Sequence, residues 1–463
     1  MNLHMPLKEL LESIHGRLLQ GNTGPILESL NFDSRTLQRD QFFWALNGER
    51  ADGHTYLEPA LRAGAAGFVV EKEILPRSVQ ERPEIPVILV RNTLRALQDL
   101  AAYRRTRYDV AVAAVTGSNG KTTTKEMLAS ILRQKEETLA SPGNLNSQIG
   151  LPLALLELKE GHRACVLELG ASEEGNIRRL AEIARPRYGV ITNIGHAHIE
   201  FFGSLEKTAR AKWELIESLP ESGHAVLPAD DPFLSRLIPQ APCPVTLFGE
   251  GPGEGVRARD IREDEGLRFT FELGPERFPV RLRALGRFNI LNALAAGACA
   301  WRMGWEPETI QRGLEAFVPV PMRMAVFAHP SGAILVNDAY NANPDSMKAS
   351  LESFYRHFKD RQRVAVLGSM LELGKESQRL HEELGAFLRD MPELDVHLVG
   401  EESRPVEEGA KRAGVKNIPC YHPTIDALKT ALLSRLGPEV AILFKASRGL
   451  RLENVINDLE RTV

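Results

Sequence analysis

Short apolar runs alternate with amphipathic stretches along most of the chain. Runs typical of buried strands occur at residues 110–115, 164–170 ("ACVLELG"), 188–195 ("YGVITNIG") and 224–231 ("HAVLPADD"), with helical patterns between them. Helices are predicted over residues 93–108 and 121–133, on either side of the first run. Strands that alternate with helices indicate βαβ units and a mainly parallel sheet.

Two later parts of the chain show different patterns. After a glycine-rich, charged stretch at residues 249–266, "LRFTFEL" and "FPVRLRAL" alternate apolar and polar residues, which predicts antiparallel strands. A helix, "NILNALAAGACAWRM", closes this region. Beyond Pro319 and Pro321, four further apolar runs alternate with predicted helices. One of these helices covers residues 345–358 and has an apolar stripe at 347, 351, 354 and 358. This last part is predicted to be a doubly wound domain.

The first 90 residues form a smaller α/β pattern. It begins with a helix predicted over residues 7–19, followed by a turn-rich stretch and the helix-to-strand sequence "LEPALRAGAAGFVVEKE". Pro76, Pro83 and Pro86 then predict a loop near a boundary. We therefore expect three α/β domains: residues 1–91, a central P-loop ATPase-like parallel sheet with a small antiparallel sheet at 92–322, and a Rossmann-like doubly wound domain at 323–463.

Length, net charge and cysteine spacing argue against several classes of function. The 463 residues fit about three domains of ordinary size. The net charge of −4 argues against a nucleic-acid or anionic-membrane partner, since either would need concentrated Lys and Arg. The four cysteines are far apart and form no CxxC pair, which disfavours a zinc site or a disulfide framework and fits a reducing cytoplasm. We expect neither a signal peptide nor a membrane span.

The stretch "AVTGSNGKTTTKEML" carries the clearest chemistry. A strand, a tight glycine turn and a helix in succession present backbone N–H groups and the positive helix end to an anion. Lys121 would reach the β and γ phosphates of a nucleoside triphosphate, and Thr122 would offer its hydroxyl to Mg²⁺. Val115 stands where the usual pattern has its first glycine, which argues against an ordinary GTPase or kinase. The alternative is a plain glycine turn that joins a strand to a helix.

Candidate metal ligands lie at the ends of the next two predicted strands. Glu168 ends "ACVLELG", and ligands of open parallel sheets bind at the carboxyl ends of strands, so it is the first candidate for a metal carboxylate. A turn-capping glutamate is the alternative. His196, His198 and Glu200 follow the next strand, and His198 could contact phosphate or a second metal. Lys212, in "EKTARAKWELIE", would on composition be a solvated lysine.

These motifs, taken together, resemble the Mur ligase family over essentially the whole chain. The resemblance rests on "TGSNGKTT", "GNLNSQIGLPLALL", "ELGA", "AHIEFFGS", "ARAKWELIE", "GRFNILNALAA", "DAYNANPDSM", "VLGSMLELG" and "KASR". "YNANP" points to the branch that adds D-alanyl-D-alanine. Departures from the family pattern occur at Phe288, Asn337, Ser369, Ala446 and Ser147.

The resemblance implies a set of ATP and metal contacts. Thr122 and Glu168 would hold one Mg²⁺, His198 would help place a second, and Lys212 matches the lysine that the family carbamylates with CO₂. Arg323 would reach the γ-phosphate. The catalytic residues would be Lys121, Glu168, His198, Lys212 and Arg323. The nucleotide would contact Gly117, Ser118, Asn119, Gly120, Lys121, Thr122, Thr123, Asn289, Asn292, Arg323, Asp338 at the ribose, and Tyr340 and Asn341 near the adenine.

The resemblance also implies the substrates and the reaction. A terminal carboxylate of UDP-N-acetylmuramoyl-tripeptide would be activated by ATP as an acyl phosphate, which the amine of D-alanyl-D-alanine would then attack. This reaction serves peptidoglycan and cell wall synthesis in the cytoplasm, and we expect a monomer. Substrate contacts would come from Asp33, Ser34, Arg35, Asn47 and Gly48 at the uridine end, Asn144 and Asn146 at the acceptor peptide, and Ser447 and Arg448 at the dipeptide.

Three alternatives remain open. Folylpolyglutamate synthase has a similar loop and C-terminal domain but lacks a domain like residues 1–91. Another Mur ligase, such as the enzyme that adds the diamino acid, is a nearer rival. In a different class, the chain could be a switch protein that hydrolyses ATP only to change shape. Candidate ligands at Glu168, His198 and Lys212 argue against a switch.

Overall fold

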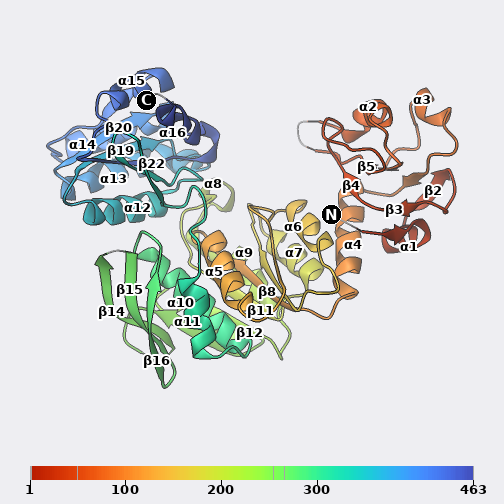
Figure 1. Cartoon of the computed structure of the whole chain (residues 1–463), viewed down its shortest axis with the longest axis horizontal. Coiled ribbons are helices and arrows are strands. Elements are labelled where there is room, and N and C mark those ends of the chain that lie inside the picture. Colours follow the sequence, from red (N-terminus) through yellow and green to blue (C-terminus); the bar gives the residue numbers. More distant parts are fainter. Residues whose placement is uncertain (1–2, 49–50, 254, 265, 462–463) are drawn as a thin grey trace. The chain divides into compact units, whose positions relative to one another are not determined.

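The computed structural model describes residues 3–48, 51–253, 255–264 and 266–461 (Figure 1). The chain divides into two compact units. The first contains Met1–Val112, Glu136–Gly170 and Arg178–Pro186, and the second contains Ala113–Lys135, Ala171–Ile177 and Arg187–Val463. In the described residues no helix is both long and apolar enough to cross a membrane.

The N-terminal part of the first unit is built on a five-stranded sheet with the order β2-β7-β6-β5-β4. All neighbours run parallel except β2 and β7. Phe43, Phe68 and Val70 on the central strands pack with Leu57 of α2 into one core. The elements are β1 (Met5–Pro6), α1 (Leu7–Ser13), β2 (Arg17–Gln20), β3 (Ile26–Leu27), β4 (Leu30–Asn31), β5 (Phe42–Trp44), α2 (Leu57–Arg62), β6 (Gly67–Val70), α3 (Arg77–Gln80) and β7 (Val87–Leu89).

Two predictions for this region are wrong in detail. The helix predicted over residues 7–19 ends at Ser13, and Arg17–Gln20 forms strand β2 instead. The chain turns at His15, whose φ is 52°, and at Gly16, so the amphipathic pattern continues across a break that periodicity does not reveal. The proline-rich run predicted as a loop contains the short helix α3, with Pro76 at its N-cap.

The remaining elements of the first unit are α4 (Thr93–Thr106), β9 (Thr138–Ala140), α6 (Gly150–Leu156), β10 (Ala164–Glu168) and most of α7 (Asn176–Ala184). The helix predicted over residues 93–108 is thus confirmed to within two residues. Its N-cap is Asn92, whose side chain accepts a hydrogen bond from the backbone N–H of Arg95 at 2.8 Å. Strands β9 and β10 run parallel.

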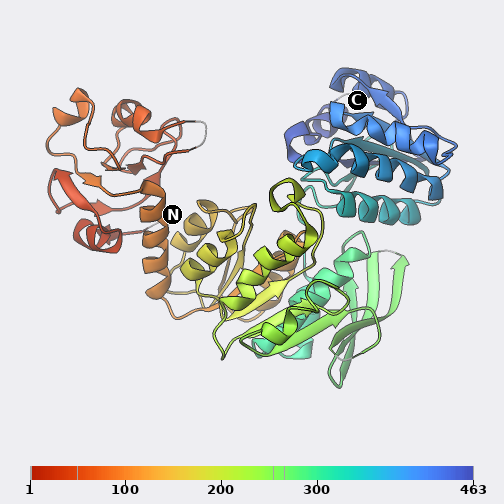
Figure 2. The same ribbon diagram turned by 180° about the vertical axis from the view of Figure 1, so that it is seen from behind.

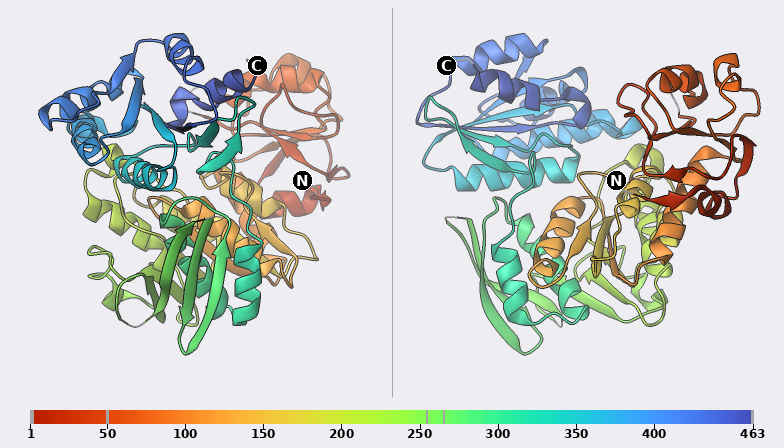
Figure 3. Two further views of the ribbon diagram at one scale, coloured as in Figure 1. Left: turned by 60° about the vertical axis from the view of Figure 1, so that its left-hand side comes forward. Right: turned by 45° about the vertical axis from the view of Figure 1, so that its right-hand side comes forward.

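A nine-stranded sheet has the order β16-β15-β14-β13-β12-β11-β8-β10-β9. From β8 to β13 the neighbours of the second unit run parallel, as the βαβ pattern predicts. Strands β14, β15 and β16 form the antiparallel ribbon, green in Figure 3. The strands are β8 (Ala111–Thr116), β11 (Tyr188–Ile191), β12 (His224–Pro228), β13 (Val245–Gly249), β14 (Val256–Asp264), β15 (Gly266–Leu273) and β16 (Glu276–Leu282). Strand β14 was missed because glycines and charges dominate that stretch.

Helix α5 (Lys121–Leu132), which follows the glycine loop, is held by two other helices of the second unit, α10 (Phe288–Arg302) and α11 (Pro307–Glu315). A Cβ on Gly313 of α11 would lie 2.3 Å from the Cα of Ile131, so glycine permits this close approach. Ser130 Oγ also donates to the carbonyl of Gly313 at 2.7 Å. The other helices of this region are α8 (Ile199–Phe202) and α9 (Leu205–Glu217).

The C-terminal region has a six-stranded sheet with the order β17-β18-β22-β19-β20-β21, parallel except for β17. Two separate cores cover its two faces, one with α12, α13 and α14 and the other with α15 and α16 (Figure 2). The doubly wound prediction is therefore confirmed. The elements are β17 (Ala325–Ala328), β18 (Ile334–Asn337), α12 (Pro344–His357), β19 (Gln362–Gly368), α13 (Ser377–Phe387), β20 (Leu394–Val399), α14 (Pro405–Arg412), β21 (Cys420–His422), α15 (Ile425–Leu433), β22 (Val440–Lys445) and α16 (Glu453–Glu460).

Candidate functional site

The glycine loop between β8 and α5 needs its two glycines. Gly117 has φ 146° and Gly120 has φ 80°, conformations that L side chains rarely adopt. A Cβ on Gly117 would lie 1.9 Å from Thr192 Oγ1, and a Cβ on Gly120 would lie 2.2 Å from Asn292 Oδ1. The loop therefore packs directly on the end of β11 and on α10, with no room for larger residues.

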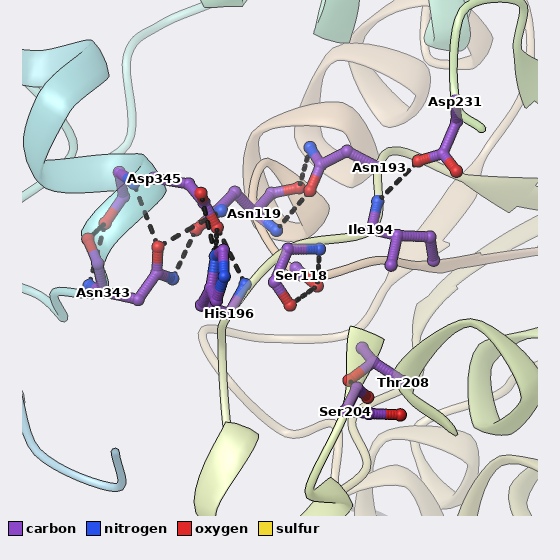
Figure 4. A network of polar contacts seen from close by, with 12 residues as sticks. Ser118, Asn119, Asn193, Ile194, His196, Ser204, Thr208, Asp231, Asn343 and Asp345 are labelled. Atoms are coloured by element: carbon purple, nitrogen blue, oxygen red, sulfur yellow. Dashed lines mark hydrogen bonds and ion pairs between the residues drawn. The ribbon is translucent and has the colours of Figure 1, made fainter. Parts of the chain in front are cut away.

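Hydrogen bonds from the segment after β11 hold the loop (Figure 4). The backbone N–H of Ser118 donates to the carbonyl of Asn193 at 3.0 Å, and that of Asn119 donates to Asn193 Oδ1 at 2.9 Å. Ser118 Oγ accepts from the backbone N–H of Gly195 at 2.8 Å and donates to its carbonyl at 3.0 Å. The loop and residues 192–195 thus form one hydrogen-bonded unit.

Lys121 lies over the loop. Its Nζ donates to the carbonyls of Gly117 at 2.9 Å and Ser118 at 3.3 Å. The Lys121 ammonium group is therefore held at the loop, and a bound anion would meet a cation in place. A triphosphate cradled by backbone N–H groups and one ammonium group is the chemistry that this arrangement fits.

Arg323 approaches the same loop from the chain between α11 and β17. Its Nη2 lies 3.5 Å from Oγ1 of Thr122, the second residue of α5. Its guanidinium carbon lies 3.9 Å from the centroid of the Tyr340 ring, so the planar group is stacked. The fold thus brings together three of the predicted nucleotide contacts that are far apart in sequence.

Lys212 is buried, which corrects its interpretation from composition as a solvated lysine. Its residue is 2% exposed on α9, and its Nζ lies 5.7 Å from the centroid of the Phe202 ring. Burial, together with the positive charge of Lys121, lowers the pKa of Lys212 to about 7. A substantial share of this amine is therefore neutral near neutral pH.

The two histidines of "NIGHAHIE" each pair with a carboxylate of the C-terminal region. His198, which has φ 58° at the N-cap of α8, places Nδ1 2.5 Å from Oε2 of Glu372. The hydrogen bond from His198 lowers the pKa of Glu372. His196 Nδ1 lies 3.0 Å from Oδ2 of Asp345. Sequence reasoning missed both acids, although Glu372 follows β19 at its carboxyl end, where the rule applied to Glu168 also holds.

Glu168 lies at the end of β10 in the first unit. It is 2% exposed, and its Oε1 accepts from Asn146 Nδ2 at 2.7 Å. Its backbone N–H donates to Ser141 Oγ at 3.1 Å. The carbonyl of Asn144 accepts from the backbone N–H of Asn146 at 2.7 Å, so the two asparagines of "GNLN" form a tight turn beside the carboxylate.

Of the two asparagines of α10, Asn289 and Asn292, the second packs against the glycine loop and the first turn of α5. Asn292 Nδ2 donates to Asn289 Oδ1 at 2.9 Å, and Asn292 Oδ1 accepts from Thr124 Oγ1 at 3.3 Å. Asn289 Nδ2 donates to the carbonyl of Leu285 at 2.8 Å. Both asparagines are buried, so in this structure they brace the start of α5. A nucleotide contact for either stays a prediction.

Asp338 lies in a buried ion pair. Its Oδ2 is 2.6 Å from Lys445 Nζ and accepts from Ser350 Oγ at 2.6 Å, while its Oδ1 accepts from the backbone N–H of Met324 at 3.1 Å. Lys445 also donates to the carbonyl of Asn341 at 3.3 Å, and burial lowers the pKa of its ammonium group. The predicted ribose contact is not tested by these bonds, which show Asp338 bracing the turn at 338–341.

The predicted dipeptide residues follow β22. Ser447 Oγ donates to the carbonyl of Ala342 at 3.2 Å and accepts from the backbone N–H of Leu371 at 2.9 Å. Arg448 is more than half exposed and places Nη1 2.5 Å from Oε1 of Glu453. Ser447 is therefore a bracing residue in this structure, while Arg448 is accessible to a ligand.

The predicted uridine-end residues lie in the N-terminal part of the first unit. Asp33 and Arg35 pair, with Nη2 2.7 Å from Oδ2, and the hydrogen bonds from Arg35 lower the pKa of Asp33 to about 2. Ser34 lies between Asp33 and Arg35, and Asn47, next to Gly48, forms an isolated bridge with Asp52. Glu49 and Arg50 of the same motif lie outside the described residues.

The residues predicted to bind magnesium include two oxygen donors, Thr122 and Glu168. Within residues 3–48, 51–253, 255–264 and 266–461, no three His, Cys, Asp or Glu side chains gather in a group that could hold a metal ion. Thr122 and Glu168 offer a hydroxyl and a carboxylate, which are donors that Mg²⁺ accepts, and Mg²⁺ usually completes its sphere with phosphate and water oxygens. Each of these two side chains is therefore of a type that suits a magnesium–nucleotide complex.

Comparison with known families matches two regions of the chain. Residues 115–300 match the model of the Mur ligase middle domain, and residues 322–448 match the model of the Mur ligase glutamate ligase domain. Between them the two matches include the glycine loop, Lys212, Arg323 and Tyr340.

Comparison with individual proteins extends over the whole chain. It is 36% identical to UDP-N-acetylmuramoyl-tripeptide--D-alanyl-D-alanine ligase of Bacillus subtilis, with 98% of each chain covered, and 33% identical to that of Escherichia coli, with 99% covered. Among solved structures, MurF from Acinetobacter baumannii superposes with a TM-score of 0.90 at 32% identity and 99% coverage of both chains. MurF from Thermotoga maritima, in complex with ADP, has a TM-score of 0.82 at 30% identity, covering 94% of this chain and 97% of that one.

Proposed function

This chain belongs to the Mur ligase family, and we propose that it is the ATP-dependent ligase of the family that joins D-alanyl-D-alanine to UDP-N-acetylmuramoyl-tripeptide. The product would be the UDP-muramoyl-pentapeptide used in peptidoglycan synthesis. Full-length similarity to several ligases of that specificity supports the substrates. It also favours this reaction over folylpolyglutamate synthesis, because the similarity covers the N-terminal domain.

One observation carries the ATP chemistry: two cationic side chains, Lys121 and Arg323, lie at the glycine loop and the start of α5. Lys121 is bonded to the loop, Arg323 lies 3.5 Å from Thr122, and the charge of Lys121 reaches the buried Lys212. Such a site stabilises the negative charge that develops on a transferred phosphoryl group. A binding module that merely recognised a peptide would have no use for this concentration of cations.

The proposed reaction has two steps. A carboxylate oxygen of the tripeptide attacks the γ-phosphorus, a new P–O bond forms, and the bond to ADP breaks. The amine of D-alanyl-D-alanine then attacks the acyl carbonyl, loses a proton, and the C–O bond to phosphate breaks. The first step brings two anions together, the second develops negative charge on the acyl oxygen, and Lys121 and Arg323 would hold the phosphate oxygens during them.

Thr122 and Glu168 are the proposed ligands of one magnesium ion, and His198 would help place a second. Magnesium, when bound, neutralises charge on the phosphate oxygens. The chain's own residues supply the orientation: Asn146 donates to Glu168, and Glu372 pairs with His198.

Lys212 is the proposed site of a carbamate. The neutral amine is the form that attacks CO₂; an N–C bond forms and a proton is released. With a pKa of about 7, Lys212 has this form available near neutral pH, whereas an exposed lysine would be almost entirely protonated. A carbamate would convert a buried cation into an anionic oxygen ligand.

The remaining assignments follow the same proposal. Residues 1–91 would bind the UDP-muropeptide, residues 92–322 would bind ATP, and residues 323–463 would contribute to the nucleotide and dipeptide sites. Nucleotide contacts are proposed for Asn289, Asn292, Asp338, Tyr340 and Asn341, and substrate contacts for Asp33, Ser34, Arg35, Asn47, Gly48, Asn144, Asn146, Ser447 and Arg448.

Phosphate release and product mass test the proposal. Purified protein with ATP and Mg²⁺ should release phosphate only when both UDP-N-acetylmuramoyl-tripeptide and D-alanyl-D-alanine are present, and the acceptor should gain the mass of the dipeptide less water. Acceptors with diaminopimelate and with lysine at the third position should both be supplied. Release without either substrate would favour a switch protein, and incorporation of a diamino acid instead of the dipeptide would favour another Mur ligase.

The substitution Lys121→Ala tests the role of this lysine at the phosphates, with Lys135→Ala as its matched control. We expect kcat/KM to fall by about 10²–10³ or more, because a preorganised charge at the phosphates is lost. Lys135→Ala removes a lysine that pairs with Glu306 away from the loop and should leave turnover unchanged. Near-normal turnover by a folded Lys121→Ala protein would contradict the assigned role.

A further inference from the structure

The first turn of α12 contacts the glycine loop directly. Asn343 Nδ2 donates to Asn119 Oδ1 at 2.8 Å, and Asn119 Nδ2 lies 3.4 Å from Asn343 Oδ1 (Figure 4). The two amide side chains therefore face each other as a reciprocal pair. They are 224 positions apart in the sequence and join the loop to the C-terminal region.

A second contact lies beside the first. Asp345 Oδ2 accepts from the backbone N–H of His196 at 2.7 Å, and His196 Nδ1 lies 3.1 Å and 3.0 Å from its two carboxylate oxygens. A Cβ on Gly195 would lie 2.4 Å from Asp345 Oδ2, so the carboxylate approaches this backbone as closely as glycine allows. We call Asn343 and Asp345 together the α12 clamp.

The α12 clamp acts on backbone that the loop already depends on. The carbonyl of Asn119 accepts from Thr192 Oγ1 at 2.5 Å and from Asn193 Nδ2 at 3.1 Å, while Ser118 is bonded to both backbone groups of Gly195. The loop, residues 192–196 and the first turn of α12 consequently form one continuous network. A shift of α12 would pull on Asn119, in the middle of the loop.

The clamp is itself rigid. Asn343 is the N-cap of α12: its Oδ1 accepts from the backbone N–H of Ser346 at 2.9 Å, and Ser346 Oγ accepts from the backbone N–H of Asn343 at 3.0 Å. This reciprocal capping box fixes the rotamer of Asn343, and Pro344 restricts the backbone that follows. The amide that reaches Asn119 is therefore held in position before any ligand binds.

From this geometry we propose that Asn343 and Asp345 are positioning residues that hold the glycine loop in its triphosphate-binding shape, through Asn119 and His196. The inference rests on the proposed ATP-dependent function. Neither residue needs to touch the nucleotide. Backbone amides bind phosphate well only when they point inward together, so loosening the middle of the loop should weaken ATP binding more than it slows the chemical step.

Asn343→Ser separates this role from helix capping. Serine is a good N-cap, so α12 should keep its stability, but its short side chain cannot reach Asn119. We expect about fivefold to tenfold weaker binding of a non-hydrolysable ATP analogue with Mg²⁺, and a similar rise in the KM for ATP with a smaller change in kcat. Asn92→Ser makes the same substitution at the N-cap of α4 and should leave both quantities unchanged.

Asp345→Asn tests the second contact. The substitution keeps the size of the side chain and removes the charge that faces His196, and its matched control is Glu352→Gln, an exposed acid on the same helix. Combined with Asn343→Ser, it should weaken analogue binding by less than the product of the two separate effects, because both act on one network. Calorimetric titration of the full-length protein measures all four variants and the double variant.

The outcomes distinguish this inference from the proposed function. Wild-type analogue affinity in both Asn343→Ser and Asp345→Asn would overturn the positioning role, as would an equal loss in Asn92→Ser and Glu352→Gln. Failure of the wild-type protein to bind the analogue at all would instead overturn the proposed ATP-dependent function. Weakened binding in the two clamp variants alone, with unchanged thermal unfolding, would support the clamp.

Discussion

Arg323 lies over the ring of Tyr340, with the guanidinium carbon 3.9 Å from the ring centroid. The stack fixes the orientation of a side chain whose other neighbour is Thr122, at the start of α5. A planar, always-charged group held in this way is suited to a phosphate oxygen, and lysine would reproduce neither the stack nor the forked donors.

Arg323→Lys should therefore lower kcat by about 10²-fold although the charge is retained, because the donors are no longer aimed. The matched control is Arg302→Lys, since Arg302 also stacks at 3.9 Å on a ring, that of Trp301, away from the loop. Steady-state turnover with all three substrates is the measurement. Equal effects in the two variants would show that the loss comes from disturbed packing.

Lys212 should make the stability of the protein pH-dependent. Its folded pKa of about 7 lies below the ordinary value of 10.5, so between these values the unfolded chain binds more protons and stability rises with pH. Below pH 7 the full cost of burying the amine is present. Lys212→Met removes this cost, and its advantage over wild type should shrink by about 1.4 kcal/mol per pH unit between pH 7 and 10.5.

Urea unfolding of both proteins in CO₂-free buffer checks this slope. The same variant should lose ligase activity, while wild-type activity should rise when bicarbonate is restored. A constant stability difference across the pH range would contradict the burial of an ionisable amine at this position.

The partly buried His224 should also make the protein less stable at acidic pH. Burial and the nearby Arg302 lower its pKa to about 4, and its Nε2 lies 2.8 Å from Thr246 Oγ1. The unfolded chain binds more protons between pH 4 and 6.5, so this stability is present above pH 6.5 and is lost as pH falls toward 4. His224→Gln, which does not titrate, should flatten the stability profile in that window.

Thermal or urea unfolding at pH values between 4 and 7 measures the effect. His15→Asn is the control, because His15 is an exposed histidine with φ 52°, a conformation that asparagine tolerates. An unchanged pH profile in His224→Gln would show that His224 stays protonated in the fold.

The substitution Gly120→Ala should abolish nucleotide binding, because the new methyl group would clash with Asn292. The added Cβ would lie 2.2 Å from Asn292 Oδ1 at φ 80°, so both the loop and α10 would have to move. Gly414→Ala has a similar φ of 72° with nothing within 4 Å of its Cβ, so it carries the backbone strain without the collision. We expect Gly414→Ala to bind an ATP analogue normally, and equal loss in both would refute the steric argument.

Local patterns were sufficient for most elements of the fold. The parallel strands β8, β10, β11 and β12, the helix after the glycine loop and the apolar stripe of α12 all lie where periodicity predicts them, whereas β9 and β13 were not predicted. Each depends on neighbours within a few positions in the sequence. Errors arose where one residue decides the outcome: Gly16 after His15 ends a helix that the pattern would continue, and glycines concealed strand β14.

The site was only partly predictable for a related reason. The loop at residues 117–122 can be recognised because glycine, lysine and threonine are needed there in a fixed local order. The burial of Lys212, by contrast, is marked only by its helical spacing from the apolar Ala209 and Ile216, and the lysine side chain itself suggests a solvated position. The acids that face His196 and His198 come from elements much later in the chain, Asp345 being 149 positions after His196, and no spacing in the sequence relates them.

The sequence by itself thus determined the order of helices and strands and the presence of a phosphate-binding loop, because both depend on residues close together in the chain. Only the tertiary structure decided the protonation of Lys212, the orientation of Arg323 and the joining of Asn119 to Asn343. Those properties depend on desolvation and on contacts between distant residues, which arise when separate elements pack against one another.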